Sequence, residues 1–161
     1  MKRESGILLS IASLPSRFGI GCFSKEAYEF VDQLKEAGQS YWQILPLGPT
    51  SYGDSPYQSF STFAGNPYFI SLEDLIQEGV LTEEECSRAD FGSRPDFVDY
   101  AKVYEERYPL LRKAYERSSI SLDPEFRKFR DENRWWLEDY ALFMAVKARF
   151  KGTAWTRWAQ D

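Results

Sequence analysis

"GILLSIA" at residues 6–12 and "YWQILPLG" at residues 41–48 are uninterrupted apolar runs of strand length. Between them, residues 25–37 place apolar side chains at helical spacing, with Ser24 as the N-cap and Gly38 at the C-terminal end. A strand, a helix and a strand within about forty residues predict a right-handed βαβ unit. Because continuous apolar runs are typical of strands buried on both faces, we expect a parallel sheet covered on both sides.

The second half of the chain is predicted to be mostly helical. A short helix is expected at 72–79, and a capping box formed by Thr82 and Glu85 starts the next one. We interpret the acidic run 83–85 as the solvated first turn of that helix. After a break that contains glycine and proline, a long helix is predicted at 98–117.

The end of the chain carries a further helix signal. Asp123 followed by Pro124 is typical of an N-cap with proline at the first helical position. The continuation, 133–150, is apolar over most of its circumference, so we expect this helix to be buried between other elements. At helical spacing, the pair Trp135 and Trp136 favours core packing over a platform for sugar rings.

The predicted strands are too few for an independent sheet. Beyond the first two strands, the only candidate is the weak signal of YFISL at residues 68–72. Two or three parallel strands with both faces covered do not form a self-sufficient sheet. We therefore expect the chain to be part of a larger fold.

Composition and charge limit the possible partners. The chain has 161 residues, of which 43% are apolar and 17% aromatic, and its net charge is −5. This acidic balance argues against nucleic acid or an anionic membrane as the main partner. No stretch approaches the ~20 apolar residues of a membrane span. Cys22 and Cys86 are interpreted as free thiols, and the N-terminal apolar run is too short for a signal peptide, so we expect a cytoplasmic protein.

The chain contains no histidine, which excludes several kinds of chemistry. Neither a Ser–His–Asp triad nor a Cys–His pair can form within it. A zinc site would need carboxylates and the two distant cysteines alone, so we expect no metal. Gly19 and Gly21 follow a predicted strand, but Ser24 stands where a dinucleotide fingerprint has its third glycine. We interpret them as a tight turn, and we expect no cofactor.

The loop 51–67, SYGDSPYQSFSTFAGNP, is unusually rich in aromatic residues. Aromatic rings stack on the apolar faces of sugars, and polar side chains can bind the sugar hydroxyls. The loop also follows the carboxyl end of a predicted parallel strand, where barrel enzymes keep their active sites. A loop merely packed by its own rings is the alternative. The residues that could contact a sugar are Tyr52, Asp54, Ser55, Tyr57, Gln58 and Asn66.

The segment 41–72, YWQILPLGPTSYGDSPYQSFSTFAGNPYFISL, closely resembles the signature of the amylomaltases. This family of 4-α-glucanotransferases includes the enzymes of bacterial maltose metabolism and the plant disproportionating enzymes. GILLSIASLPSRFGIG, WWLEDYALFMAVK and the final W-x-R-W resemble the same family in the same order. The resemblance therefore covers essentially the whole chain. Ser51 and Ser71 depart from it, because the family usually has Gly and Asp at these positions.

The resemblance implies a (β/α)₈ barrel with helical insertions that transfers α-1,4-glucan segments between maltooligosaccharides or amylose. Catalysis in the family is retaining and metal-free, with an Asp nucleophile and a Glu acid/base. Nothing in this chain matches the motifs around those two residues, and a barrel needs about 250 residues. We therefore expect the N-terminal part of such a barrel, inactive alone, whose partner is the remaining C-terminal portion. Residues 1–81 are the first βαβ unit with the substrate loop 48–67, and 82–161 are a truncated helical insertion.

The resemblance also implies roles for individual residues in the loop. Tyr57 lines the main cleft near the reacting sugar, with Ser55 hydrogen-bonding beside it and Gln58 in the same substrate-binding loop. Asp54 is interpreted as an acceptor that fixes the loop, because one carboxylate cannot carry a two-carboxylate mechanism.

A secondary glucan site is implied as well, in which Tyr52 and Tyr104 hold a distant part of a long chain. Two other interpretations stay open. The chain could be a separate, non-catalytic glucan-binding module, or a helical interaction protein with no role in sugar binding.

Overall fold

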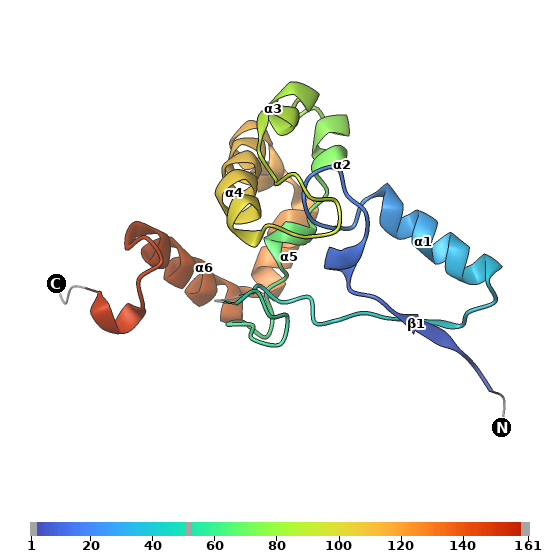
Figure 1. Ribbon diagram of the computed structural model, residues 1–161. Coiled ribbons are helices and arrows are strands. Elements are labelled where there is room, and N and C mark those ends of the chain that lie inside the picture. Colours follow the sequence, from blue (N-terminus) through green and yellow to red (C-terminus); the bar gives the residue numbers. More distant parts are fainter. Residues whose placement is uncertain (1–2, 51–52, 159–161) are drawn as a thin grey trace. The chain divides into compact units, whose positions relative to one another are not determined.

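The computed structural model describes residues 3–50 and 53–158 (Figure 1). The chain is mostly helical, with one small parallel sheet, and divides into two compact units, Met1–Ser118 and Ser119–Asp161. The predicted boundary between 1–81 and 82–161 stays a prediction. No helix among the described residues is both long and apolar enough to cross a membrane.

The predicted βαβ unit is confirmed in its order and direction. Strand β1 (Gly6–Leu8) pairs in parallel with β2 (Tyr41–Gln43), and helix α1 (Lys25–Glu36) connects them. The prediction that the strands are buried was wrong for this chain. Ile7 is 43% exposed and Leu8 is 59% exposed, because no third strand among the described residues continues the sheet.

Both strands are shorter than the apolar runs that predicted them. In the first run, Ser10 ends the extended segment because its side chain accepts a hydrogen bond from the Ala12 backbone N–H. This caps the 3-10 turn η1 (Ile11–Ser13), whose first residue is buried with Leu14. The Trp42 indole N–H donates to the Leu9 carbonyl at 2.9 Å, so the residue after β1 stays attached to β2.

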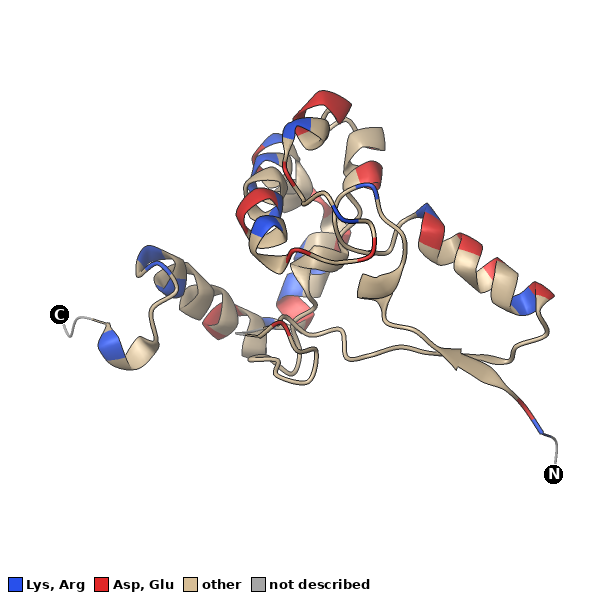
Figure 2. Cartoon of the chain, in the orientation of Figure 1, with Lys and Arg blue, Asp and Glu red and all other residues tan. Residues whose placement is uncertain are grey.

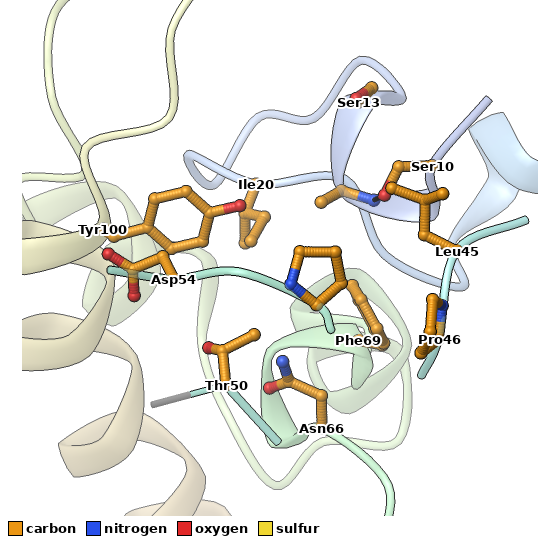
Figure 3. Close-up of a pocket in the computed structure, with 12 residues that line it drawn as sticks. Ser10, Ser13, Ile20, Leu45, Pro46, Thr50, Asp54, Asn66, Phe69 and Tyr100 are labelled. Carbon is orange, nitrogen blue, oxygen red and sulfur yellow. Dashed lines mark hydrogen bonds between the residues drawn. The ribbon is translucent and has the colours of Figure 1, made fainter. Parts of the chain in front are cut away.

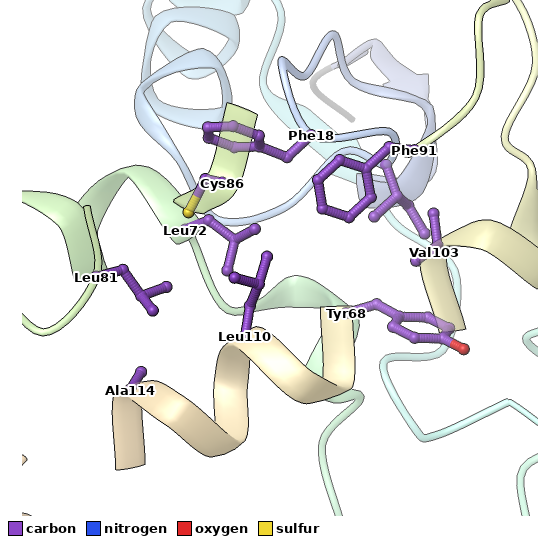
Figure 4. Packing of buried hydrophobic residues seen from close by; sticks show 10 residues of the cluster. Phe18, Tyr68, Leu72, Leu81, Cys86, Phe91, Val103, Leu110 and Ala114 are labelled. Atoms are coloured by element: carbon purple, nitrogen blue, oxygen red, sulfur yellow. The ribbon is translucent and has the colours of Figure 1, made fainter. Parts of the chain in front are cut away.

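The main core of the first unit packs helix α2 (Leu72–Gln77), helix α3 (Glu83–Arg88) and helix α4 (Tyr100–Arg117) against the segment that follows β1. Figure 4 shows Leu72 and Leu110 at the centre of this cluster. The Phe18 and Phe91 rings meet edge to face with centroids 6.0 Å apart. Cys86 lies in the same core, and it and Cys22 are free thiols, as predicted.

The predicted strand at 68–72 was wrong. Asn66 caps the 3-10 turn η2 (Pro67–Phe69), and Ser71 caps α2 by accepting from the Asp74 backbone N–H at 3.0 Å. The two caps turn the backbone twice within six residues, which leaves no extended segment long enough to pair.

The capping box of α3 is confirmed, and it has a second role. Glu85 accepts from the Thr82 backbone N–H, and it also accepts from Lys113 and Arg117 of α4 at 2.7–3.0 Å. Hydrogen bonds from Arg117 and then Lys113 hold the pKa of the Glu85 carboxyl far below its usual range. The acidic run is thus the first turn of a helix, as predicted, but its third residue is an ion-pair partner that joins α3 to α4.

The second unit contains helix α5 (Pro124–Glu132), helix α6 (Arg134–Arg149) and the short turns η3 (Ile120–Leu122) and η4 (Trp155–Arg157). Asp123 caps α5 by accepting from two backbone N–H groups, as predicted. The prediction that α6 is buried was wrong. None of the described residues 119–158 is buried. Trp135 is 66% exposed, contrary to the core-packing interpretation.

Candidate functional site

A cavity of about 170 Å³ lies in the first unit, where the segments that follow β1 and β2 come together (Figure 3). In parallel sheets this carboxyl edge is the usual place for ligand sites. Residues from four segments line the cavity. They are Ser10, Ala12, Ser13 and Ile20 after β1; Leu45, Pro46, Thr50, Asp54 and Pro56 after β2; Asn66 and Phe69 around η2; and Tyr100 at the start of α4.

Asn66 is the most tightly held polar residue of the pocket. It is only 7% exposed, and its side-chain oxygen accepts from the Tyr68 backbone N–H at 3.0 Å. Its own backbone N–H donates to the Leu47 carbonyl at 2.8 Å, which ties the turn to the segment after β2. With the oxygen engaged, the side-chain NH₂ is the group of Asn66 that can donate to a ligand.

Among the described residues that line the pocket, Asp54 is the one that carries a formal charge. It has a left-handed backbone, with φ of 54°, directly after Gly53 with φ of 85°. Asp adopts this region more readily than most residues. Burial raises the pKa of the Asp54 carboxyl above its usual value. Asp54 is the single charged residue in the stretch 37–72, and the chain between α1 and α2 is accordingly almost entirely tan in Figure 2.

Tyr100 forms the helical side of the pocket. It is the first residue of α4, which begins where Asp99 accepts from the Lys102 backbone N–H. Its ring is tilted against that of Tyr68, with centroids 6.4 Å apart, and burial raises the pKa of its hydroxyl. Figure 3 shows the Tyr100 ring reaching from α4 toward Ile20, beside Asp54.

The predicted loop residues are not all brought into this pocket. Asp54 lines it, but Tyr57 is 73% exposed and Gln58 is also exposed. Ser55 organises the turn between them, because its hydroxyl accepts from the Tyr57 backbone N–H and its carbonyl accepts from the Gln58 N–H. The turn directs Pro56 to the pocket and leaves the ring of Tyr57 open to solvent.

The two residues predicted for a secondary glucan site differ in what the structure describes. Tyr104 on α4 is 59% exposed, and its ring meets the Tyr108 ring edge to face at 5.1 Å. Tyr52 lies outside the described residues. The pairing of these two rings stays a prediction.

Sequence reasoning missed several pocket residues: Ser10, Ser13, Thr50 and Tyr100. A usable signal existed for Ser13 and Thr50, because each follows the carboxyl end of a predicted parallel strand. Ser10 carried none, since it lies within the first predicted strand, residues 6–12. Tyr100 carried no such signal, since its place in the pocket depends on how α4 packs.

The pocket lining combines hydroxyls, an amide, prolines and rings with a single carboxylate. Neither Lys nor Arg is among the described lining residues, so these residues offer no cationic group to a phosphate. No group of residues suited to hold a metal ion occurs among the described positions. This chemistry fits a neutral ligand with many hydroxyl groups, which needs polar partners on an otherwise apolar wall.

Known proteins resemble the chain over nearly its full length. It matches the 4-alpha-glucanotransferase family over residues 9–161. It is 52% identical over 158 residues to a 4-alpha-glucanotransferase of Streptococcus pneumoniae, covering 98% of this chain and 31% of that protein. To the Thermus thermophilus 4-alpha-glucanotransferase it is 48% identical over 162 residues, again covering 98% of this chain and 31% of the relative. The chain thus spans about a third of the length of these relatives.

A solved structure has the same fold. The amylomaltase from Streptococcus agalactiae in complex with acarbose superposes with a TM-score of 0.89 at 44% identity. The match covers 99% of this chain and 32% of that one. The architecture described above is therefore that of a fragment of a barrel enzyme.

Proposed function

The chain belongs to the 4-alpha-glucanotransferase family, and from this premise we propose that it forms the N-terminal part of an enzyme that transfers α-1,4-glucan segments. The family match over residues 9–161 carries this proposal. In it, β1, α1 and β2 are the first βαβ unit of a (β/α)₈ barrel, and the substrates are maltooligosaccharides or amylose. The free, buried cysteines are consistent with a reducing compartment such as the cytoplasm.

The partner of the chain in this proposal is the remainder of the barrel. A two-stranded parallel sheet is not stable by itself, and parallel strands are normally covered on both faces. Here the sheet leaves Ile7, Leu8 and Tyr41 exposed. Further barrel strands and helices would remove these side chains from water.

The chemistry of the pocket supports a sugar substrate. Its lining is uncharged apart from Asp54, and hydroxyl and amide groups alternate with Pro and aromatic rings. The bound acarbose of the Streptococcus agalactiae relative points to the same ligand class. In the complete enzyme, Tyr57 stacks on a sugar near the reacting bond, Ser55 and Gln58 hydrogen-bond beside it, and Asp54 holds the loop.

The reaction itself needs groups that this chain does not supply. A retaining transfer uses two carboxylates, one as nucleophile and one as acid/base. The described part of the pocket lining contains one carboxylate, that of Asp54. The nucleophile and the acid/base therefore come from outside residues 1–161, no metal or cofactor takes part, and the chain alone transfers no glucan.

The test uses a full-length enzyme in which this chain replaces the matching segment of the Streptococcus pneumoniae relative. Tyr57→Ala should lower the rate on maltotriose roughly ten- to hundredfold, a loss of about 1–3 kcal/mol in transition-state binding. Tyr104→Ala should spare maltotriose and change the products formed from amylose. Tyr28→Ala is the matched control, because Tyr28 is 71% exposed on α1 and has no proposed role.

The outcomes separate the interpretations. Glucose release from maltotriose by the 161-residue chain above a blank would show that the catalytic carboxylates lie within it. If Tyr57→Ala spares both substrates, the ring is not at the reacting sugar. A chimera that binds maltooligosaccharides but never transfers them favours a non-catalytic glucan-binding module.

A further inference from the structure

A completely buried arginine connects three segments of the first unit. Arg107 on α4 is 0% exposed, although arginine is rarely buried without a charged partner. One terminal nitrogen of its guanidinium, Nη1, donates to the Phe18 carbonyl at 3.3 Å, and the other, Nη2, donates to the Ile70 carbonyl. Burial lowers the pKa of Arg107, as expected for a charge taken out of water.

Each of these contacts is adjacent to the candidate pocket. Phe18 precedes the pocket residue Ile20 by two positions, and Ile70 directly follows the pocket residue Phe69. On α4, Arg107 lies about two helical turns from Tyr100, on the same side of the helix. A single guanidinium thus joins the segment after β1, the turn η2 and the helix α4.

Burying the Arg107 guanidinium costs desolvation free energy that its hydrogen bonds only partly offset. Arg107 Nε has no hydrogen-bond partner among the described residues, and the guanidinium donates to two backbone carbonyls and also hydrogen-bonds the buried thiol of Cys22. Glu73 contributes a favourable charge nearby, but its buried oxygen Oε1 also has no hydrogen-bond partner in the described part of the chain. An apolar side chain would fill the same core with less desolvation. The planar fork, however, is the group that can hold two carbonyls at a set separation.

We propose that Arg107 is a positioning residue of the pocket. Its guanidinium sets the spacing between the segments that carry Ile20, Phe69 and Tyr100, and so the width of the cavity between them. The inference rests on the proposed function of this pocket as a sugar site. Arg107 itself does not line the cavity and acts only through these segments.

The experiment compares Arg107→Met, Arg107→Lys and Arg112→Met in the 161-residue chain. Met fills the space but leaves the two carbonyls without a donor, and Lys can donate to one of them. Arg112 is an exposed arginine on the same helix and serves as the matched control. Two quantities are measured well below each melting temperature: the affinity for maltoheptaose, and the nuclear Overhauser contacts among Ile20, Phe69 and Tyr100.

For Arg107→Met we expect these contacts to weaken and the affinity to fall more than tenfold, with partial recovery in Arg107→Lys and no change in Arg112→Met. A residue that only stabilised the fold would lower the melting temperature and leave both quantities unchanged, which would overturn the proposal. If the Met variant does not fold, the Lys variant decides by the same measurements. If the unsubstituted chain binds no maltoheptaose, the affinities are measured in the full-length chimera instead, where absence of binding would overturn the sugar site, and the Overhauser contacts judge the positioning role.

Discussion

The two units of the chain contrast in what they bury. In the first unit, α2, α3 and α4 enclose side chains such as Leu72 and Val103 that are 0% exposed. In the second unit, α6 is more apolar along its length than α4 is. None of the residues of α6 is buried, however, and Leu142 is 64% exposed. The comparison teaches that an apolar helix can form from local signals, whereas burial needs a second surface.

The contrast also appears in the range of the contacts. The first unit joins positions far apart in sequence, such as Phe18 with Phe91 and Arg17 with Glu83. The ion pairs of the second unit include Lys128 with Glu132, one helical turn apart. We therefore expect the first unit to unfold cooperatively and the second to melt as local helices.

The largest expected effect tests this contrast with one substitution in each unit. Leu72→Ala removes a fully buried side chain and should cost about 2–5 kcal/mol in the free energy of unfolding. Leu142→Ala removes an exposed one and should change it by less than about 0.5 kcal/mol. Urea titrations followed by far-ultraviolet circular dichroism measure both. Equal losses of unfolding free energy in the two variants would contradict the contrast between the units, because α6 would then have a packing partner in the isolated chain.

An intermediate effect concerns the link between α3 and α4. The pKa of Glu85 is lowered in the folded state, so its contribution to stability is present above the unfolded-state value of about 4.3 and is lost as the pH falls below it. Glu85→Gln should lower the melting temperature at pH 7 and flatten its decline between pH 5 and pH 2. Glu84→Gln is the control, since the ion pair that the described residues give Glu84 is with Arg88 on its own helix. If the melting temperature of Glu85→Gln declined between pH 5 and pH 2 as steeply as that of the unsubstituted chain, the ion pairs of Glu85 would not stabilise the first unit.

The smallest expected effect tests whether the helices of the second unit are stabilised by local interactions. Asp123→Ala removes the N-cap of α5 and should destabilise that helix by about 1 kcal/mol. The helical signal should decrease while the cooperative unfolding midpoint of the first unit stays the same. Ser119→Ala is the control, because the Ser119 side chain makes no capping hydrogen bond. A shift of the cooperative midpoint in Asp123→Ala would mean that the two units unfold together.

Local signals were sufficient for much of the secondary structure. The parallel βαβ order, the capping box at Thr82 and the cap at Asp123 were predictable because each depends on groups within a turn or on the order of elements. Gly38, with φ of 70°, ends α1 for the same kind of reason. The long motif at 41–72 was likewise sufficient to identify the family.

Only the tertiary structure decided which helix is covered and which side chains meet. The end of β1 is local by contrast, because the Ser10 side chain accepts from the Ala12 backbone N–H two residues later, although the apolar run continues beyond it. Tyr100 reaches the pocket and Arg107 reaches two distant carbonyls because α4 packs on segments some thirty to ninety residues away. A side chain is buried only when a segment from elsewhere in the chain packs against it. A pattern of apolar side chains can show that a covering surface is needed, but it does not show which segment of the protein provides that surface.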